Sequence, residues 1–324
     1  MSSPLLIFVP AKNEAATIQI ILRALRERFQ DLPQPPDLLV IDDGSSDETS
    51  SLTQQEGAIV IRHECSQGLG RTFREAQQYA LTHHYATLLT IDGDRQFREE
   101  DLRTIYNKLT KEGYDFVSGS RFLPESQTIN MPHSKKIGNH GLARLVASIT
   151  KRPITDSTCG LRGYSRQALE SLHTFSTFTY THEVILNLGM KPLRFAEVPI
   201  VVRYFPERVS RIAASLFRYG IKTIVILLQS LLLYQPARFF TALAVPFFVS
   251  GVPSALFVGA RYLITGFVSP YKSIGIFGLI MTTAGIIIAT SGALLQMLAW
   301  TQITIEQILF EQRRRPPSSH AKPD

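Results

Sequence analysis

Two carboxylates separated by one glycine follow an apolar stretch of the chain, and their oxygens can bind a metal ion. Asp92 and Asp94 come directly after residues 88–91, which read as the end of a buried strand. A turn at Gly93 can aim both side chains at one ligand, with the carbonyl oxygen of Gln96 as a third donor. Hard oxygen donors of this kind suit Mg²⁺ or Mn²⁺ held mainly through the phosphates of a substrate. By itself the pattern also fits two solvated acids, with Asp94 capping the next helix.

A second acidic pair, Asp42 and Asp43, closes another apolar stretch. Gly44 permits an unusual backbone turn, and the Ser, Asp, Glu and Thr side chains at 45–49 can cap the helix that follows. A helix cap and a ligand-binding loop fit this pattern equally well.

Two further loops offer groups that can reach a nucleotide. Pro10 stops an apolar stretch, and the next polar residues, Asn13 and Glu14, can face a ribose or base as readily as they can cap a helix. Gly68 and Gly70 precede a helical stretch and allow a backbone to approach a ligand closely. The third glycine of a dinucleotide fingerprint and the Lys-Ser/Thr of a P-loop are missing from this sequence.

Alternating strands and helices must position these loops. Strands are expected at residues 5–10, 37–43, 58–63, 85–92 and 114–121, and helices at 13–29, 45–57, 70–84 and 98–113. Such alternation predicts an α/β domain with a mostly parallel sheet and helices on both faces. Ligands of such sheets lie beyond the carboxyl ends of the strands. Pro10, Asp42, Asp92 and Ser120 all fall at those ends, so we expect their loops to meet at one edge.

The last third of the chain is much more apolar than the rest. Residues 239–260 and 273–298 contain no Asp, Glu, Lys or Arg, and each run is long enough to span about 30 Å of hydrocarbon as a helix. Before them, residues 211–236 combine an apolar run with Arg218 and Lys222, which is typical of an amphipathic helix at a membrane surface. We therefore expect an interfacial helix followed by a two-helix transmembrane hairpin.

The basic residues gather beside these apolar segments, and the formal net charge is +7 at pH 7. Arg208, Arg211 and the tail at 311–324 flank the apolar part, whereas the connection at 261–272 holds two basic residues. We therefore expect anionic lipid and phosphate ligands and no nucleic acid. The same distribution predicts an integral membrane protein with two spans, whose residues 1–210 and C-terminus are cytoplasmic. The tail is expected to be disordered.

The histidines form no catalytic pattern. His63, His83, His84 and His140 show neither an HExxH motif nor another metal-ligand spacing. We expect all four at the protein surface.

Taken together, the motifs resemble the family 2 glycosyltransferases of GT-A fold. Within them the chain is similar to the polyprenyl-phosphate sugar synthases (dolichol-phosphate mannose synthase-like), including a subgroup with a C-terminal membrane hairpin. The matching pieces are "PAKNE", "DDGSSDET", "GLG", "DGDRQF", "GSR", "DSTCGLRGYSR" and "EVPIVVRY", spread over residues 5–212. The resemblance implies a GT-A (Rossmann-like) catalytic domain at 1–210, the interfacial helix at 211–236, the hairpin at 237–310 and the basic tail at 311–324.

The resemblance also implies donor-side roles. Asp92 would lie near ribose and diphosphate, and Asp94 and Gln96, the latter through its side chain, would hold Mg²⁺ or Mn²⁺, with Asp92 counted in the metal site. Contacts with the nucleotide sugar are implied for Pro10, Ala11, Glu14, Asp42, Asp43, Gly68, Arg208 and Arg211. The usual Gly-x-Ser-Lys reads "RVSR" at residues 208–211, and Ser66 stands where the family commonly has Asn.

On the acceptor side, the resemblance implies that Arg121 holds a phosphate. Lys135 and Asn139 stand where the family has an Arg and a Ser that share this task. Lys is a point charge rather than a two-pronged donor, so the geometry there differs. Asp156 is either a catalytic helper near the acceptor or a structural cap.

The implied reaction is metal-dependent, inverting transfer of a hexose from UDP-glucose or GDP-mannose to a polyprenyl phosphate at the cytoplasmic membrane face. The acceptor is already anionic, so no strong general base is required. The sequence leaves the oligomeric state open, and a homo-oligomer such as a tetramer, formed through the membrane helices, is one option. One alternative is a glycosyltransferase that elongates a cell-envelope glycan or uses another lipid acceptor, although a processive synthase would normally carry QxxRW. Another is a non-catalytic membrane partner of a lipid-sugar flippase, which would be expected to have lost the carboxylates or Arg121.

Overall fold

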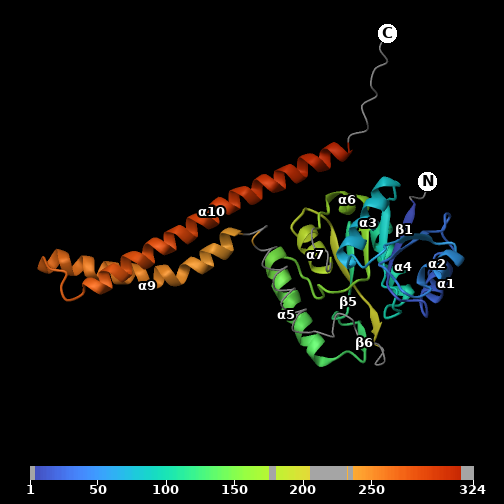
Figure 1. Cartoon of the computed structure of the whole chain (residues 1–324), viewed down its shortest axis with the longest axis horizontal. Coiled ribbons are helices and arrows are strands. Elements are labelled where there is room, and N and C mark those ends of the chain that lie inside the picture. Colours follow the sequence, from blue (N-terminus) through green and yellow to red (C-terminus); the bar gives the residue numbers. More distant parts are fainter. Residues whose placement is uncertain (1–3, 175–179, 205–231, 233–235, 315–324) are drawn as a thin grey trace, which may run out of the picture. The chain divides into compact units, whose positions relative to one another are not determined.

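The computed structural model describes residues 4–174, 180–204, 232 and 236–314 (Figure 1). The chain divides into two compact units, Met1–Lys222 and Thr223–Asp324. The first unit holds an α/β domain and the second holds two long helices. Most of the interfacial helix expected at 211–236 and the tail beyond residue 314 lie outside the described residues.

A seven-stranded sheet forms the centre of the first unit, in the order β3-β2-β1-β4-β7-β5-β8. Its strands are β1 (Leu5–Ala11), β2 (Asp37–Asp42), β3 (Ile59–Arg62), β4 (Thr87–Thr90), β5 (Phe116–Ser120), β7 (Arg162–Ser165) and β8 (Phe195–Pro199). All neighbouring strands pair parallel except β7, which is antiparallel to both β4 and β5. The predicted mostly parallel sheet is confirmed.

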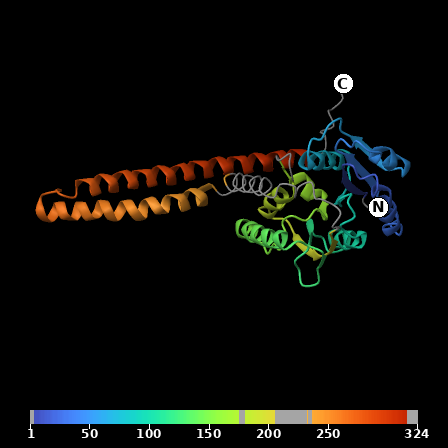
Figure 2. The same ribbon diagram turned by 60° about the horizontal axis from the view of Figure 1, so that its bottom comes forward.

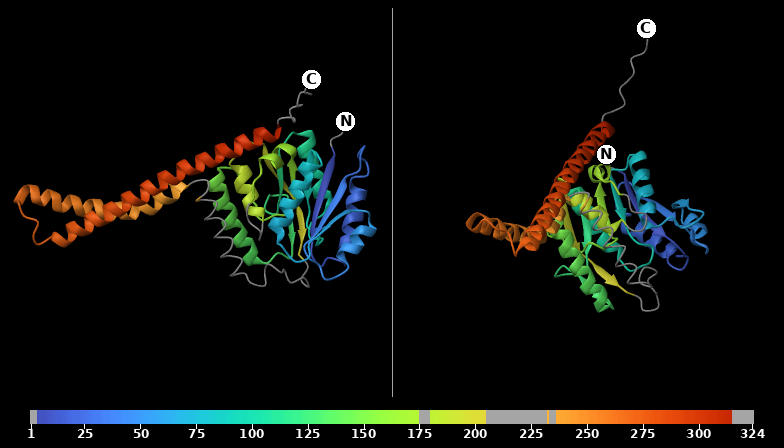
Figure 3. Two further views of the ribbon diagram at one scale, coloured as in Figure 1. Left: turned by 45° about the horizontal axis from the view of Figure 1, so that its top comes forward. Right: turned by 60° about the vertical axis from the view of Figure 1, so that its left-hand side comes forward.

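Helices cover both faces of this sheet (Figure 3). They are α1 (Ile18–Arg28), α2 (Thr49–Gln55), α3 (Leu69–Thr82), α4 (Glu99–Lys111), α5 (His133–Thr150), α6 (Arg166–Ser171) and α7 (Thr181–Gly189). A short parallel pair, β6 (Gln127–Ile129) with β9 (Val201–Arg203), forms a second sheet. The four helices expected from the sequence are α1 to α4.

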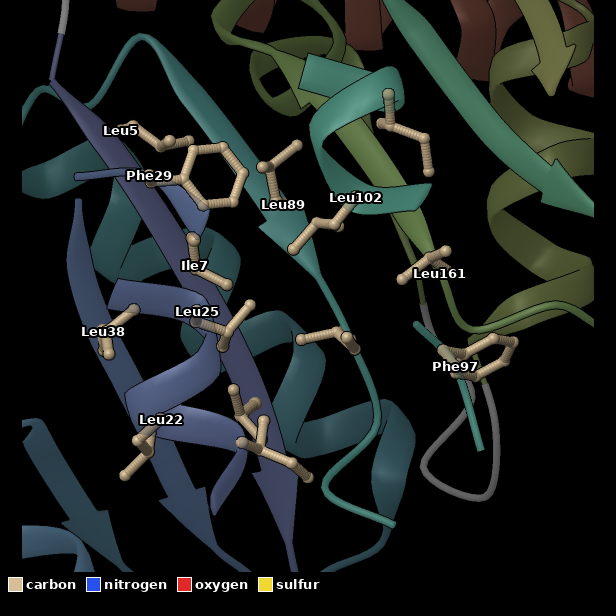
Figure 4. Close-up of a cluster of buried hydrophobic side chains, with 14 of the residues drawn as sticks. Leu5, Ile7, Leu22, Leu25, Phe29, Leu38, Leu89, Phe97, Leu102 and Leu161 are labelled. Atoms are coloured by element: carbon tan, nitrogen blue, oxygen red, sulfur yellow. The ribbon is translucent and has the colours of Figure 1, made fainter. Parts of the chain in front are cut away.

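The apolar core between α1, α4 and the sheet holds the strands in register (Figure 4). Ile7 of β1 and Leu89 of β4 face Leu22 and Leu25 of α1, and all four side chains are fully buried. Burying one such side chain contributes about 1.5–3 kcal/mol. Because side chains alternate between the two faces of a strand, a one-residue shift would turn these apolar side chains away from the core. The core therefore fixes the register, and with it the residues at the carboxyl ends of the strands, which form the polar edge of the sheet.

Strand β7 separates two strands that are consecutive along the first half of the sequence, β4 and β5. Gly163 of β7 lets α4 lie directly on the strand, because a Cβ there would be 2.5 Å from a side-chain carbon of Ile105. The sequence predicted five strands, the last at residues 114–121, and none beyond. β7 brings the loop before it, residues 155–161, between the ends of β4 and β5.

In the second unit, helix α9 (Pro236–Thr265) packs side by side with the N-terminal part of the longer helix α10 (Lys272–Arg314) (Figures 1 and 2). By length and composition, Pro236–Thr265 and Lys272–Ala299 are candidate membrane spans. A Cβ at Gly278 would be 2.5 Å from the backbone nitrogen of Ala255, so small residues allow this close approach. The two predicted apolar spans thus correspond to two candidate spans.

Candidate active site

The loops that follow β1 and β2 are joined by hydrogen bonds between backbone and side chains. The Asn13 N–H donates to Ser45 Oγ (2.8 Å), and the Ser46 N–H donates back to Asn13 Oδ1 (2.8 Å). The Glu14 N–H donates to Thr49 Oγ1 (2.8 Å). Asn13 has a φ of 51°, in the left-handed region that Asn tolerates better than most residues. The "PAKNE" and "DDGSSDET" segments therefore form one surface.

The other residues predicted on the donor side lie along this surface. Pro10 and Ala11 pair with Ile41 and Asp42 in the sheet, and the Ala11 carbonyl accepts the Asp43 N–H (2.9 Å). The Glu14 carboxylate accepts a hydrogen bond from the Thr17 hydroxyl (3.2 Å). They come together as predicted, and their contacts with a ligand remain a prediction.

Asp42 points into the protein. Its carboxylate is fully buried and accepts hydrogen bonds from the Ser45 N–H (2.8 Å) and the Ser50 hydroxyl. Arg62 Nε lies 4.0 Å from the same carboxylate. Asp42 thus stabilises the turn that leads into α2.

Asp43 organises the glycine loop. Its carboxylate accepts hydrogen bonds from Ser66 Oγ (2.6 Å) and from the N–H groups of Gln67 (2.7 Å) and Gly68 (3.1 Å). It also lies 2.9 Å from His63 Nδ1. Burial alone would raise the pKa of Asp43, but these hydrogen bonds together hold its pKa below the ordinary value. Gly68, with a φ of 91°, precedes α3.

His63 is buried, so the prediction that it lies at the surface is wrong. Its ring lies between the carboxylates of Asp43 and Glu75. The signal was its position directly after β3, beside the acidic end of β2, where the adjoining parallel strand brings the two together.

The "DGD" segment forms a tight turn at the end of β4. The Gln96 N–H donates to Asp94 Oδ1 (3.1 Å), and Arg95 between them has a φ of 59°. The Gln96 carbonyl accepts the Arg203 N–H (3.0 Å), so we expect its side-chain amide, rather than its carbonyl, to bind a ligand. Asp94 and Gln96 are half-buried. They lie at the polar edge, as predicted.

Asp92 rests against the backbone of Gly160. A Cβ on Gly160 would be 2.6 Å from Asp92 Oδ2, so only glycine leaves room for this carboxylate. Burial raises the pKa of Asp92 to about 7 and the charge of Asp94 adds to the effect, while Arg162 and Arg121 oppose it. Asp92 keeps some exposed surface even though protein atoms surround it. The turn therefore holds two mutually repelling carboxylates, a concentration of acidic groups that favours bound positive charge.

This concentration fits a divalent cation. Carboxylate and amide oxygens of Asp92, Asp94 and Gln96 are the donors that Mg²⁺ and Mn²⁺ prefer. In the part of the chain that the structure describes, no group of three or more His, Cys, Asp or Glu side chains is arranged to hold a metal ion. A cation here would need further ligands from a bound substrate, such as phosphate oxygens.

Arg121 and Asp156 form a buried, two-pronged ion pair. Arg121 Nε and Nη2 donate to the two Asp156 oxygens (2.6 and 2.8 Å), while Nη1 donates to the Tyr204 hydroxyl (2.9 Å) and Nη2 also to the Thr158 hydroxyl. These bonds use four of the five N–H donors of a guanidinium. Burial opposes the charged form of Asp156, but Arg121 holds its pKa below the ordinary value.

Glu197 of β8 stabilises this pair by binding the backbone beside Asp156. Its carboxylate accepts hydrogen bonds from the N–H groups of Thr155 (2.8 Å) and Asp156 (3.1 Å). Asp156 is thus held in place by Arg121 on one side and by β8 on the other, in agreement with the structural role that the sequence left open. Contact of Arg121 with a phosphate remains a prediction.

A buried cation, Arg162, directly follows the loop at 155–161 and contacts its backbone. Its Nη2 donates to the Ser157 carbonyl (3.3 Å), and its guanidinium carbon lies 5.8 Å from the ring centroid of Tyr180. Burial lowers the pKa of the nearby His182 to about 4, and the charge of Arg162 acts in the same direction. The sequence reasoning missed this group, because Arg162 begins β7, a strand that the sequence did not predict.

The remaining predicted acceptor residues are only partly placed. Helix α5 lies beside the residue after Arg121, because the rings of Phe122 and His140 have centroids 4.4 Å apart. Asn139 is half-buried on this helix. The side chain of Lys135, and both Arg208 and Arg211, lie outside the described residues.

With this geometry, the comparisons with known proteins agree on one family. A model described as glycosyl transferase family 2 matches residues 6–172, more than half of the chain. The chain belongs to glycosyl transferase family 2. It is therefore a glycosyltransferase.

Relatives within the family include enzymes named for polyprenyl phosphates. UDP-N-acetylglucosamine–dolichyl-phosphate N-acetylglucosaminyltransferase of Methanococcus voltae is 25% identical over 225 residues, covering 63% of this chain and 88% of its own. Dolichyl-phosphate hexose transferase of Haloferax volcanii is 32% identical over 161 residues, covering 50% and 68%.

The fold of this family 2 member also matches solved structures. Glucosyl-3-phosphoglycerate synthase from Mycobacterium tuberculosis, in complex with Mn²⁺, UDP-glucose and phosphoglyceric acid, aligns with a TM-score of 0.55 and 20% identity. The alignment covers 71% of this chain and 80% of that one. At this identity the match confirms the GT-A fold.

Proposed function

We propose that this family 2 enzyme transfers a hexose from a nucleotide sugar to a polyprenyl phosphate at the cytoplasmic face of a membrane. The observation that carries the proposal is the loop at 156–160. At one end Asp156 holds Arg121, and at the other Gly160 lies against Asp92. One short loop thus contacts both Arg121, which can bind an anion, and Asp92, which suits a metal–diphosphate.

The donor would lie on the surface formed by the loops after β1, β2 and β4. Pro10, Glu14, Asp43 and Gly68 contribute to this surface, while the buried residues Ala11 and Asp42 support it from inside the protein. We assign the metal to Asp92, Asp94 and Gln96. Mg²⁺ or Mn²⁺ bound there would neutralise the charge of the leaving diphosphate. The half-buried position of these side chains limits access of water, which strengthens such electrostatic effects.

The acceptor would approach from the side of Arg121 and α5. Its phosphate oxygen attacks the anomeric carbon in line, the new carbon–oxygen bond forms, and the bond to the diphosphate breaks with its electron pair. The configuration inverts, and no proton must be removed because the attacking oxygen is already anionic. Arg121 would hold this anion beside the donor, with Lys135 and Asn139.

The candidate spans explain why such an acceptor suits this chain. The hydrocarbon tail of a polyprenyl phosphate stays in the bilayer, so the site must work at a membrane surface. Helices α9 and α10 would anchor the enzyme there. The relatives named for dolichyl phosphate support the same acceptor class.

A donor screen tests the proposal. Full-length protein in detergent is incubated with undecaprenyl or dolichyl phosphate, Mg²⁺ or Mn²⁺, and labelled UDP-glucose, GDP-mannose or UDP-N-acetylglucosamine. We expect label in the lipid fraction from one donor, and loss of that label with Asp94→Asn. Asp31→Asn is the matched control, because it makes the same change at a surface ion pair with Arg103. Wild-type protein that labels no lipid from any common nucleotide sugar would contradict the proposal.

A further inference from the structure

His63 lies between two carboxylates, with each ring nitrogen facing one of them. Nδ1 is 2.9 Å from Asp43 Oδ1, and Nε2 is 2.7 Å from Glu75 Oε2 on α3. A neutral imidazole has one N–H and one lone pair, so only the doubly protonated ring can donate to both. Burial favours the neutral ring, but the bonds to Asp43 and Glu75 outweigh it and raise the pKa of His63.

Other charged groups near the ring are engaged elsewhere or point to solvent. The Asp42 carbonyl accepts the His63 N–H (2.9 Å), while its carboxylate bonds to Ser45 and Ser50. On the ring's own segment, Arg62 donates to the Ser45 carbonyl (3.2 Å) and Glu64 is exposed. Asp43 and Glu75 are therefore the charges that set the protonation of His63.

The same contacts connect His63 to the glycine loop. Asp43 accepts hydrogen bonds from Ser66, Gln67 and Gly68, and the loop then leads into α3, which carries Glu75. The loop also lies directly on Gly44, where a Cβ would be 2.9 Å from the Ser66 nitrogen. His63 therefore ties the end of β2 to α3 across this loop.

We propose that protonated His63 is a positioning residue for the donor: it holds Asp43 and the loop at 66–68 in the conformation that binds the nucleoside, and nucleotide binding weakens when it loses its proton. The inference rests on the proposed function, in which Asp43 and Gly68 contact the nucleotide sugar. Because two carboxylates stabilise the ring's charge, His63 keeps its proton to a higher pH than an ordinary imidazole does, and loses it as the pH rises further.

Titration calorimetry of the full-length protein with UDP and with GDP, each with MgCl₂, tests this inference. As the pH is raised and His63 loses its proton, we expect the Kd of the bound nucleotide to rise about tenfold. Glu75→Gln removes one stabilising charge and should move this rise to lower pH.

Two substitutions of His63 separate its contacts. The Asn amide nitrogen can replace Nδ1 and donate to Asp43, whereas the Gln amide nitrogen can replace Nε2 and donate to Glu75. We expect His63→Asn to keep the Kd, at every pH, within about threefold of the value that wild type shows while His63 is protonated, because the Asn amide does not titrate. His63→Gln should weaken binding about tenfold, a loss of roughly one charged hydrogen bond.

Several outcomes would overturn the inference. One is a wild-type Kd that does not change with pH, and another is equal binding by the Asn and Gln variants. Equal falls in thermal midpoint and in affinity for both variants would assign His63 to folding instead. Nucleotide binding needs neither acceptor nor transfer, so a lack of lipid labelling with normal binding counts against the proposed function alone. A wild-type protein that binds neither nucleotide at any pH would overturn both.

Discussion

The proposed donor side and acceptor side of this site are stabilised differently. On the donor side, short polar side chains such as Asn13, Thr49 and Asp43 bind the backbone of neighbouring loops. On the acceptor side, Arg121 and Asp156 neutralise each other inside the protein. In the part of the chain that the structure describes, the donor edge brings together the carboxylates of Asp92 and Asp94, whereas Asp156 balances the charge of Arg121 on the acceptor side.

This difference between the two sides indicates where a bound ligand would have to replace existing hydrogen bonds. A metal ion bound with a diphosphate would neutralise the Asp92 and Asp94 carboxylates without breaking the hydrogen bonds that join the donor loops. An acceptor phosphate must share Arg121 with Asp156, Thr158 and Tyr204, so it has to compete with existing bonds. Substitutions on the two sides should therefore have different consequences.

The largest effect should come from breaking the buried ion pair. Asp156→Asn leaves the Arg121 charge without its partner inside the protein, and such changes cost about 3–5 kcal/mol. Urea unfolding, followed by far-UV circular dichroism, measures this loss in the free energy of unfolding. Arg28→Gln, which breaks an exposed pair with Glu100, is the control and should cost at most about 1 kcal/mol.

The same pair predicts a dependence on pH. The folded pKa of Asp156 is below its unfolded value, so its stabilisation is complete above about pH 4 and is lost as the pH falls through the lower, folded value. The gap between wild type and Asp156→Asn should shrink in acid. A gap that stays constant down to the folded pKa and below would contradict this assignment.

A smaller effect should follow from disturbing the contact between Gly160 and Asp92, where the loop from the acceptor side meets the donor side. Gly160→Ala places a Cβ where Asp92 Oδ2 lies 2.6 Å away, so the carboxylate must move. Misplacing a catalytic group by about 1 Å can cost about 100-fold in rate. Lipid labelling at saturating donor measures the loss. Gly138→Ala on α5, where a Cβ meets open space, should keep the wild-type rate.

The smallest effect should come from loosening the donor loops. Asn13→Gly removes the acceptor of the Ser46 N–H but tolerates the positive φ at this position. One lost hydrogen bond of about 1 kcal/mol corresponds to about a fivefold rise in the donor KM. Initial rates over a range of donor concentrations measure it. A fall in kcat at unchanged KM would instead connect this loop with the chemical step.

Much of the donor side could be predicted from the sequence because its signals are local. Apolar strands ending in Pro10, Asp42 and Asp92 predict their own position at the carboxyl edge of a parallel sheet. The turn at Asp94 likewise depends on residues that are adjacent in the chain. These elements were confirmed in the structure.

The acceptor side could not be predicted in this way, because it depends on contacts between distant segments. Nothing within "GSR" shows that Arg121 pairs with Asp156, or that β8 supports the pair through Glu197. His63 was misjudged for the same reason, since its two carboxylates lie on other elements. Such pairings follow from sheet order, which hydrophobic periodicity does not specify.

The position of β7 between β4 and β5 also affects the order of folding. During synthesis, β4 and β5 emerge early but have no direct pairing with each other, and the sheet can join them only after Ser165 has been made. Such long-range pairing is slow compared with the formation of local structure. Asp92 and Arg121 can therefore reach their final relative positions only once β7 has docked, because β7 carries Gly160 and Asp156 into place.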